Sequence, residues 1–211
     1  MKRNTIVIGV TLFILAGLAW AGWANWQYRK QAAEKRLANV SQAELVEAGD
    51  AQAALNPLIG KPAPQFSLED LSGKKVSLAD YKGKALLINF WATWCGPCKV
   101  ETPWLVDLRN QYASKGFEIL GISAEGDDLA PSDKEGWARD KTAIGDFVQR
   151  MHMPYPVLID GDSLAKPYGG LDAMPTSFFV DRSGKIVAAT MGITSKDDIE
   201  ENIQKALKSS S

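Results

Sequence analysis

The longest apolar stretch of the chain lies close to its N-terminus. Residues 5–24 read TIVIGVTLFILAGLAWAGWA, and no charged side chain occurs from Asn4 to Tyr28. An α-helix of this length spans about 30 Å, the thickness of the hydrocarbon core of a bilayer. Aromatic rings, which settle at the lipid–water boundary, gather at its far end, at Trp20, Trp23, Trp26 and Tyr28. The pattern predicts one transmembrane helix within residues 1–28.

The sequence leaves the processing and the orientation of this segment open. Ala19-Trp20-Ala21 resembles a signal-peptide cleavage site. However, the apolar run exceeds the roughly 7–15 residues of a signal peptide, which favours an uncleaved signal anchor. Lys2 and Arg3 form a very short basic tail before the segment, which indicates export of the rest of the chain. The basic residues that follow favour the opposite orientation, and these are Arg29, Lys30, Lys35 and Arg36.

The pattern of apolar positions changes twice after the anchor. Residues 29–56 are rich in Ala, Glu, Gln and Lys, which predicts a helical or semi-flexible tether. From Pro57 onward, short apolar runs of strand length alternate with helical stretches. We expect strands at 66–68, 76–78, 85–91, 117–123, 156–160, 176–181 and 185–190, and helices at 97–114, 137–151 and 197–208.

This alternation predicts an α/β domain over residues 57–208, with a central sheet flanked by helices. The run 85–91, ALLINFW, is continuously apolar, as is typical of a strand buried on both faces. The first two predicted strands form a hairpin around a Gly-containing turn, and Arg182-Ser183-Gly184 separates the last two. The sheet is therefore expected to be mixed. The serines at 209–211 predict a disordered tail.

Composition excludes some classes of function. The 211 residues are 45% hydrophobic, and the formal net charge is −1. Such a balance leaves no basic surface for nucleic acid, so nucleic acid is not an expected partner. The chain has two cysteines, too few for a disulfide scaffold, and a domain of this size does not need one.

Both cysteines, Cys95 and Cys98, fall where the strand 85–91 ends and a helix begins. Pro97 suits the first helical turn, where its missing N–H is not needed. Residues three apart share a helix face, close enough for a disulfide. The unpaired N–H groups and the dipole at a helix start favour a thiolate at Cys95. Cys98 would stay a thiol until it attacks a mixed disulfide. The spacing therefore predicts dithiol exchange.

The cysteine pair has two simpler interpretations, neither of which involves redox chemistry. A structural zinc site takes about four ligands, whereas the chain offers two cysteines and the distant His152. A pair of buried structural thiols is the second. A CxxC pair at a strand–helix turn favours redox chemistry over both, so no metal is expected.

The sequence around the pair is similar to a known family. Residues 90–98, FWATWCGPC, resemble the active site of thioredoxin, and residues 60–103 are similar to the membrane-anchored TlpA/ResA-type thiol-disulfide oxidoreductases. The similarity covers about 58–207. It implies a thioredoxin fold with an N-terminal β-hairpin and an insert, and no cofactor. It also implies a domain on the periplasmic side of the cytoplasmic membrane.

The resemblance further implies partners. The family reduces disulfides of proteins outside the membrane, and apocytochrome c and envelope assembly proteins are among its substrate classes. The resemblance also implies a membrane-embedded thiol donor, which would reduce the Cys95–Cys98 disulfide after each turnover. The direction of electron transfer stays open. The dipeptide Gly96-Pro97 is that of thioredoxin, a reductant, but the dipeptide does not by itself set the reduction potential of the pair.

Further site residues follow from the resemblance. Met174, Pro175 and Thr176 match the family's cis-proline loop, which faces the cysteines and can pair with a substrate strand. Glu101 matches an acid three residues beyond the second cysteine, which could take the proton of Cys98. The alternative is that Glu101 is a solvated residue on the surface of the helix, without a catalytic role.

Two residues near the cysteine pair, Trp94 and Asn89, bear on its chemistry. Trp94 either touches partners, together with Gly96 and Pro97, or only packs beside the site, as Trp91 does. Asn89 stands where thioredoxin has a buried aspartate. Asparagine cannot accept a proton, so this departure raises the importance of Glu101.

Two other functions remain as alternatives. A thiol peroxidase shares this fold but has a threonine three residues ahead of its cysteine, where this chain has Ala92. A copper metallochaperone pairs cysteines at a spacing of three with a suitably placed histidine, whereas His152 is expected at a helix end on the surface. The acidic insert 124–140 is interpreted as a solvated segment, and the alternative is that it shapes partner choice.

Overall fold

The computed structural model describes residues 17, 20, 22, 23, 25, 27, 56–125, 133–171 and 173–209. The chain divides into two compact units, Met1–Ala51 and Gln52–Ser211. The predicted anchor and tether lie almost wholly outside the described residues, as do residues 210 and 211. Among the residues that are described, no helix combines the length and the apolar character needed to cross a membrane. The anchor therefore stays a prediction.

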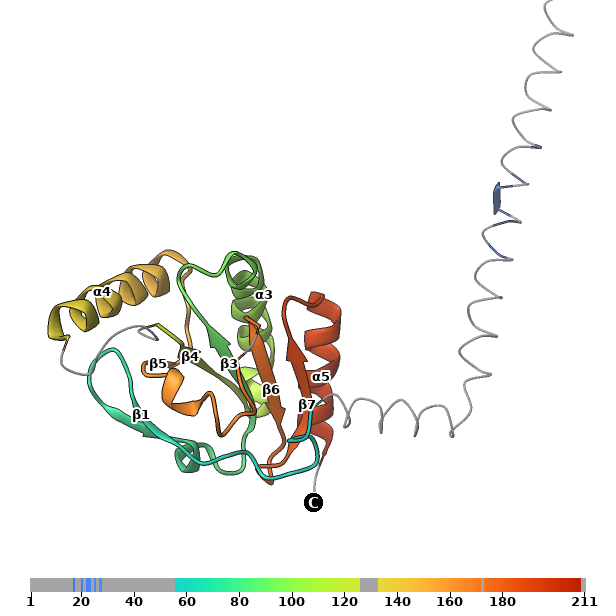
Figure 1. The fold of residues 1–211 in the computed structure, drawn as a ribbon. Helices are drawn as coiled ribbons and strands as arrows, with labels where there is room; N and C mark the ends of the chain where they lie inside the picture. Colours follow the sequence, from blue (N-terminus) through green and yellow to red (C-terminus); the bar gives the residue numbers. More distant parts are fainter. Residues whose placement is uncertain are drawn as a thin grey trace, which may run out of the picture. The chain divides into compact units, whose positions relative to one another are not determined.

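The second unit is built on a mixed five-stranded sheet (Figure 1). Its strand order is β5-β4-β3-β6-β7, in which β3, β4 and β5 are parallel and β6 and β7 run antiparallel to their neighbours. Every residue of the central strands β3 and β4 is buried, as their continuous apolar sequences predict. The strands are β3 (Ala85–Trp91), β4 (Phe117–Ser123), β5 (Val157–Leu158), β6 (Thr176–Val180) and β7 (Ile186–Met191).

Helices cover one face of this sheet. They are α3 (Gly96–Tyr112), α4 (Lys134–Arg150) and α5 (Lys196–Lys208), and all three contribute to one apolar cluster. Right-handed crossovers place α3 and α4 on the same side, because β3, β4 and β5 follow one another across the sheet. The second apolar cluster, on the other face, includes the hairpin of β1 (Ser67–Glu69) and β2 (Lys75–Ser77) and the 3-10 segments η1 (Leu78–Tyr81) and η3 (Asp162–Leu164). The remaining 3-10 segment, η2 (Ala113–Lys115), follows α3 directly.

The predicted elements are confirmed, with two notable differences at their ends. Helix α4 begins three residues earlier than expected, because the Asp133 side chain caps it by accepting from the Gly136 N–H. Strand β5 is only two residues long. Beyond it, the N–H of Ile159 donates to the carbonyl of Glu69 in β1, and Asp160 has a φ of +69°. The chain therefore leaves the sheet earlier than its apolar pattern indicates.

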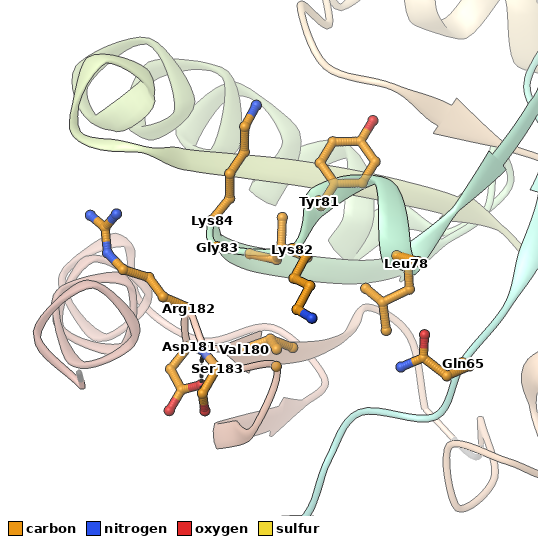
Figure 2. A pocket seen from close by; sticks show the side chains of 13 residues that line it. Gln65, Leu78, Tyr81, Lys82, Gly83, Lys84, Val180, Asp181, Arg182 and Ser183 are labelled. Atoms are coloured by element: carbon orange, nitrogen blue, oxygen red, sulfur yellow. Dashed lines mark hydrogen bonds between the residues drawn. The ribbon is translucent and has the colours of Figure 1, made fainter. Parts of the chain in front are cut away.

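The cysteine pair and the cavity described next lie at opposite ends of the sheet. The cysteines follow the carboxyl end of β3, whereas its first residues pair with the end of β6, Leu86 with Val180. A cavity of about 300 Å³ lies at this second end, lined by parts of 78–86 and 180–184 and by Gln65. Figure 2 shows the Lys82 side chain extending toward the 180–183 segment. Since this cavity shares no residue with the cysteine region, we assign it no part in thiol chemistry.

Candidate active site

Cys95 and Cys98 form a disulfide at the start of α3, with an S–S distance of 2.06 Å and a Cα–Cα distance of 5.3 Å. Cys95 is the N-cap residue, and its sulfur accepts from the Cys98 N–H at 3.2 Å. A sulfur in this position would benefit as a thiolate from the helix dipole and the free N–H groups. Both residues are buried, with 4% and 1% of their surface exposed.

The Met174–Pro175 peptide bond is cis, as the resemblance implied. Thr176 opens β6 and pairs with Phe90, near the end of β3 that leads to the cysteines. Met174 is half-buried and packs against the apolar cluster that contains both cysteines. The predicted proline loop and the cysteine pair therefore share one edge of the sheet.

Glu101 is buried, with 1% of its surface exposed, so its interpretation as a solvated glutamate is wrong. Its Oε2 accepts from Asn89 Nδ2 at 3.0 Å, and Asn89 also donates to Ser177 Oγ at 3.0 Å. Its Oε1 has no hydrogen-bond partner among the described residues. Burial raises the pKa of Glu101 to about 7, while the bond from Asn89 acts in the opposite direction. A carboxyl group with this pKa can exchange protons at neutral pH.

The tryptophans beside the pair differ in burial. Trp91 is buried and stacks on Phe147 of α4, with ring centroids 4.8 Å apart. Trp94 is 63% exposed, so most of its ring faces solvent. Gly96 and Pro97 are also exposed at the start of α3.

Other apolar residues, which the sequence did not single out, are exposed at this end of the sheet. Met191 is half exposed and pairs with Thr176, and Ile193 follows it closely. Val100 is exposed in the first turns of α3. We call Trp94, Val100, Met191 and Ile193 the apolar rim. Position in the chain gave no signal for Met191 and Ile193, because only the β6–β7 pairing brings them beside the proline loop.

Glu125 is a further residue that the sequence did not single out. It follows β4, is buried, and accepts a hydrogen bond from the N–H of Thr93, in the turn before Cys95. The N–H of Ala124 donates to the carbonyl of Trp91. The first residues of the predicted insert therefore support the cysteine turn. Their position at the carboxyl end of a parallel strand was the available signal.

His152 lies apart from these residues. It is exposed just beyond α4, and its Nδ1 is 3.1 Å from the carbonyl oxygen of Arg150. Within the described ranges, no three or more His, Cys, Asp or Glu side chains gather in a way that could hold a metal ion.

A disulfide-bonded cysteine pair at a strand–helix turn, with a cis-proline at the same end of a mixed sheet, is typical of thioredoxin-like thiol-disulfide oxidoreductases. Residues 59–189 match the AhpC/TSA family. ResA thiol-disulfide oxidoreductases are similar in sequence. The protein from Bacillus thuringiensis subsp. konkukian is 38% identical over 148 residues, which cover 70% of this chain and 78% of that protein. The protein from Bacillus subtilis is 31% identical over 142 residues, with 67% and 72% covered. The chain belongs to the AhpC/TSA family and, within it, to the ResA/TlpA-type thiol-disulfide oxidoreductases.

Solved structures agree with this assignment. A putative thiol:disulfide interchange protein DsbE from Chlorobium tepidum aligns with a TM-score of 0.58 and 30% identity, covering 71% of this chain and 97% of that one. A putative thioredoxin from Neisseria meningitidis aligns with a TM-score of 0.57 and 30% identity, covering 70% and 91%.

The burial of Glu101 predicts a pH-dependent stability. Its pKa is about 7 in the folded chain, against an ordinary value of 4.5. Between these values the folded chain holds a proton that the unfolded chain releases, so the free energy of unfolding falls as pH rises. We expect Glu101→Gln to remove this fall, which amounts to at most about 3 kcal/mol. Chemical denaturation across this pH range measures it.

The matched control is Glu201→Gln, which changes an exposed carboxylate on α5 and should leave the pH dependence as in the unmodified protein. Parallel stability curves for the unmodified protein and Glu101→Gln would contradict the raised pKa.

Proposed function

We propose that this protein is a membrane-tethered reductase that passes two electrons from Cys95 and Cys98 to disulfides of proteins outside the cytoplasmic membrane. The observation that carries the proposal is the cysteine pair at the start of α3, one helical turn before a buried carboxyl group whose pKa is near neutrality. The relatives named thiol-disulfide oxidoreductase ResA support the same reaction class.

The first step is attack by the Cys95 thiolate on one sulfur of a substrate disulfide. A mixed disulfide forms, and the other substrate sulfur leaves as a thiolate. An extended substrate strand would pair with the backbone at Met174, Pro175 and Thr176. Trp94, Gly96 and Pro97, which are exposed beside Cys95, would contact that strand.

The second step needs a proton acceptor for Cys98. Glu101 lies three residues further along α3, on the same helix face, and both side chains are buried. The Cys98 thiol gives its proton to Glu101, and its sulfur attacks Cys95. The Cys95–Cys98 disulfide forms, and the second substrate sulfur is released as a thiolate. A membrane-embedded thiol donor would then reduce the pair.

The variants Cys95→Ser and Cys98→Ser should behave differently. Without Cys95 the first attack cannot occur, so we expect loss of disulfide reduction. Without Cys98 the mixed disulfide cannot be resolved, so substrates should stay covalently attached to Cys95. Reduction assays and nonreducing electrophoresis measure the two outcomes.

An active Cys95→Ser variant would contradict the assigned order of attack. Consumption of hydrogen peroxide without disulfide reduction would favour a thiol peroxidase. A reduction potential near −120 mV for the unmodified pair, rather than near the −270 mV of thioredoxin, would reverse the direction of electron transfer.

The apolar rim supports a substrate that exposes apolar side chains near its disulfide. Such side chains are exposed in chains that have not completed folding, and we propose apocytochrome c or an envelope assembly protein as the substrate. Burial of one rim side chain by such a partner would contribute on the order of 1 kcal/mol to binding.

We therefore expect Met191→Ser or Ile193→Ser to raise KM for an apolar disulfide peptide about fivefold, as follows from such a loss, with kcat little changed. Glutathione disulfide is the control substrate, because it has no apolar side chains to meet the rim. An equal effect on both substrates would indicate distortion of the site instead.

The entry of the chain into the second unit is compatible with a tether. The N–H of Gly60 donates to the carbonyl of Ile186 at 2.8 Å, at the start of β7, whereas the cysteines lie at the other end of the sheet. A chain entering at this end leaves the cysteine edge free for partners. The apolar segment 5–24 and the exported side remain proposals from sequence.

Labelling of intact cells by a membrane-impermeant thiol reagent tests the orientation. After treatment of the cells with a membrane-impermeant reductant, which frees the thiols of the Cys95–Cys98 disulfide, we expect the unmodified chain to be labelled without lysis. A cytoplasmic thiol protein is the control for leakage. Labelling only after lysis would place the domain in the cytoplasm, as the basic residues after the apolar segment favour.

A further inference from the structure

Several buried polar atoms around the site have no hydrogen-bond partner among the described residues. They are Trp91 Nε1, Glu101 Oε1, Ser123 Oγ and the Tyr155 hydroxyl. Folded proteins leave few such atoms unpaired, and a group of them in one region indicates a shared function or shared water. Only Glu101 among them has a role in the dithiol exchange proposed above.

The register of the sheet brings these residues together. Gly121 of β4 lies beside Asn89 of β3, and Ser123 lies beside Trp91. Neighbours across parallel strands point to the same face, as do residues two apart on one strand. That face is the one covered by α3, because Asn89 donates to Glu101 there.

The absence of a side chain at Gly121 leaves room for two aromatic rings. A Cβ atom at this position would lie 3.1 Å from Trp91 Nε1 and 3.2 Å from Cε2 of Tyr155. The rings of Trp91 and Tyr155 therefore both lie over Gly121. Gly121 is the neighbour of Asn89 across the sheet, and Asn89 donates to Glu101. Tyr155 is buried in the same apolar cluster as the cysteines.

The chemistry of the unpaired atoms is complementary. A tyrosine hydroxyl and an indole N–H are donors, whereas an ionised carboxylate only accepts. Asn89 occupies Oε2 of Glu101, so Oε1 is the oxygen available to another donor. The charge of Glu101 also reaches Tyr155, whose pKa is raised first by burial and then by that charge.

We propose that Tyr155 is a positioning residue for Glu101, whose free oxygen Oε1 is linked to the Tyr155 hydroxyl by one buried water that donates to Glu101 and accepts from Tyr155. Trp91 Nε1 and Ser123 Oγ supply further partners for such a water, which takes two to four polar neighbours. The inference rests on the proposed function, because it assigns Tyr155 a part in the proton transfer from Cys98 to Glu101.

The expected effect follows from the groups around Glu101. On its own helix these are Cys95 and Cys98, and β3 contributes the neutral Asn89. Glu125, after β4, already accepts from Thr93, and the parts of α4 and α5 in this cluster are apolar. A water that is held by Tyr155 and donates to Glu101 stabilises the carboxylate over the acid, so removal of the Tyr155 hydroxyl should raise the pKa of Glu101.

The test is Tyr155→Phe in the full-length chain, compared with Glu101→Gln. Reduced protein releases two thionitrobenzoate ions from Ellman's reagent, the first on attack by Cys95 and the second on resolution by Cys98. We expect the pH midpoint of the second release to rise by about one unit, the effect of losing a hydrogen bond to a charged group. From a midpoint of about 7, this slows the release at pH 7 about fivefold.

Tyr168→Phe is the matched control. Tyr168 is also buried but belongs to the cluster on the other face, where its hydroxyl donates to the carbonyl of Pro64 at 2.9 Å. This variant should keep the midpoint of the unmodified protein. An unchanged midpoint in Tyr155→Phe, with the titration lost in Glu101→Gln, would overturn the inference alone. An unchanged profile in Glu101→Gln would instead overturn the role of Glu101 in the proposed function.

A second measurement leaves both residues in place, in case Tyr155→Phe does not fold. With 3-fluorotyrosine at position 155 of the full-length chain, the fluorine resonance should titrate with the midpoint of Glu101, about 7. The titration should vanish in Glu101→Gln, and the same label at position 168 should not show it. A label at 155 that does not respond to the charge of Glu101 would overturn the inference.

Discussion

The junction between β3 and α3 is the constraint on which the rest of the site depends. A fully buried strand ends at Trp91, and four residues later Cys95 caps a helix whose first turn contains Cys98. The strand cannot shift without exposing its apolar residues to water, because both of its faces are covered. The sulfur atoms are therefore held at the helix start, where the dipole favours a thiolate.

The polar groups on the helix side of the sheet are arranged around this junction. Glu101 is buried on α3 and accepts a hydrogen bond from Asn89 of β3, and Asn89 also donates to Ser177 of β6. Burying a carboxyl group with one hydrogen bond disfavours its charged form. The same burial that lowers stability at higher pH gives this group a pKa near neutrality, where it can accept a proton.

Buried and exposed residues are separated at the end of the sheet that holds the cysteines. The cysteines and Glu101 are buried, whereas Trp94, Met191 and Ile193 are exposed around them. The proline loop lies between, because Thr176 pairs both with β3 and with the end of β7. In the proposed function, a partner would contact the apolar rim while its disulfide meets Cys95.

The sequence by itself determined the elements and the position of the cysteine pair at the start of a helix. Continuous apolar runs such as 85–91 predict buried strands, and a CxxC pair at a strand end predicts thiol chemistry, since both signals are local. Resemblance added the proline loop and Glu101. Only the tertiary structure decided that Glu101 is buried, that Met191 and Ile193 flank the site, and that Tyr155 and Trp91 meet above Gly121. The pKa and accessibility of a side chain depend on neighbours from other strands, and the order and register of the strands set those neighbours.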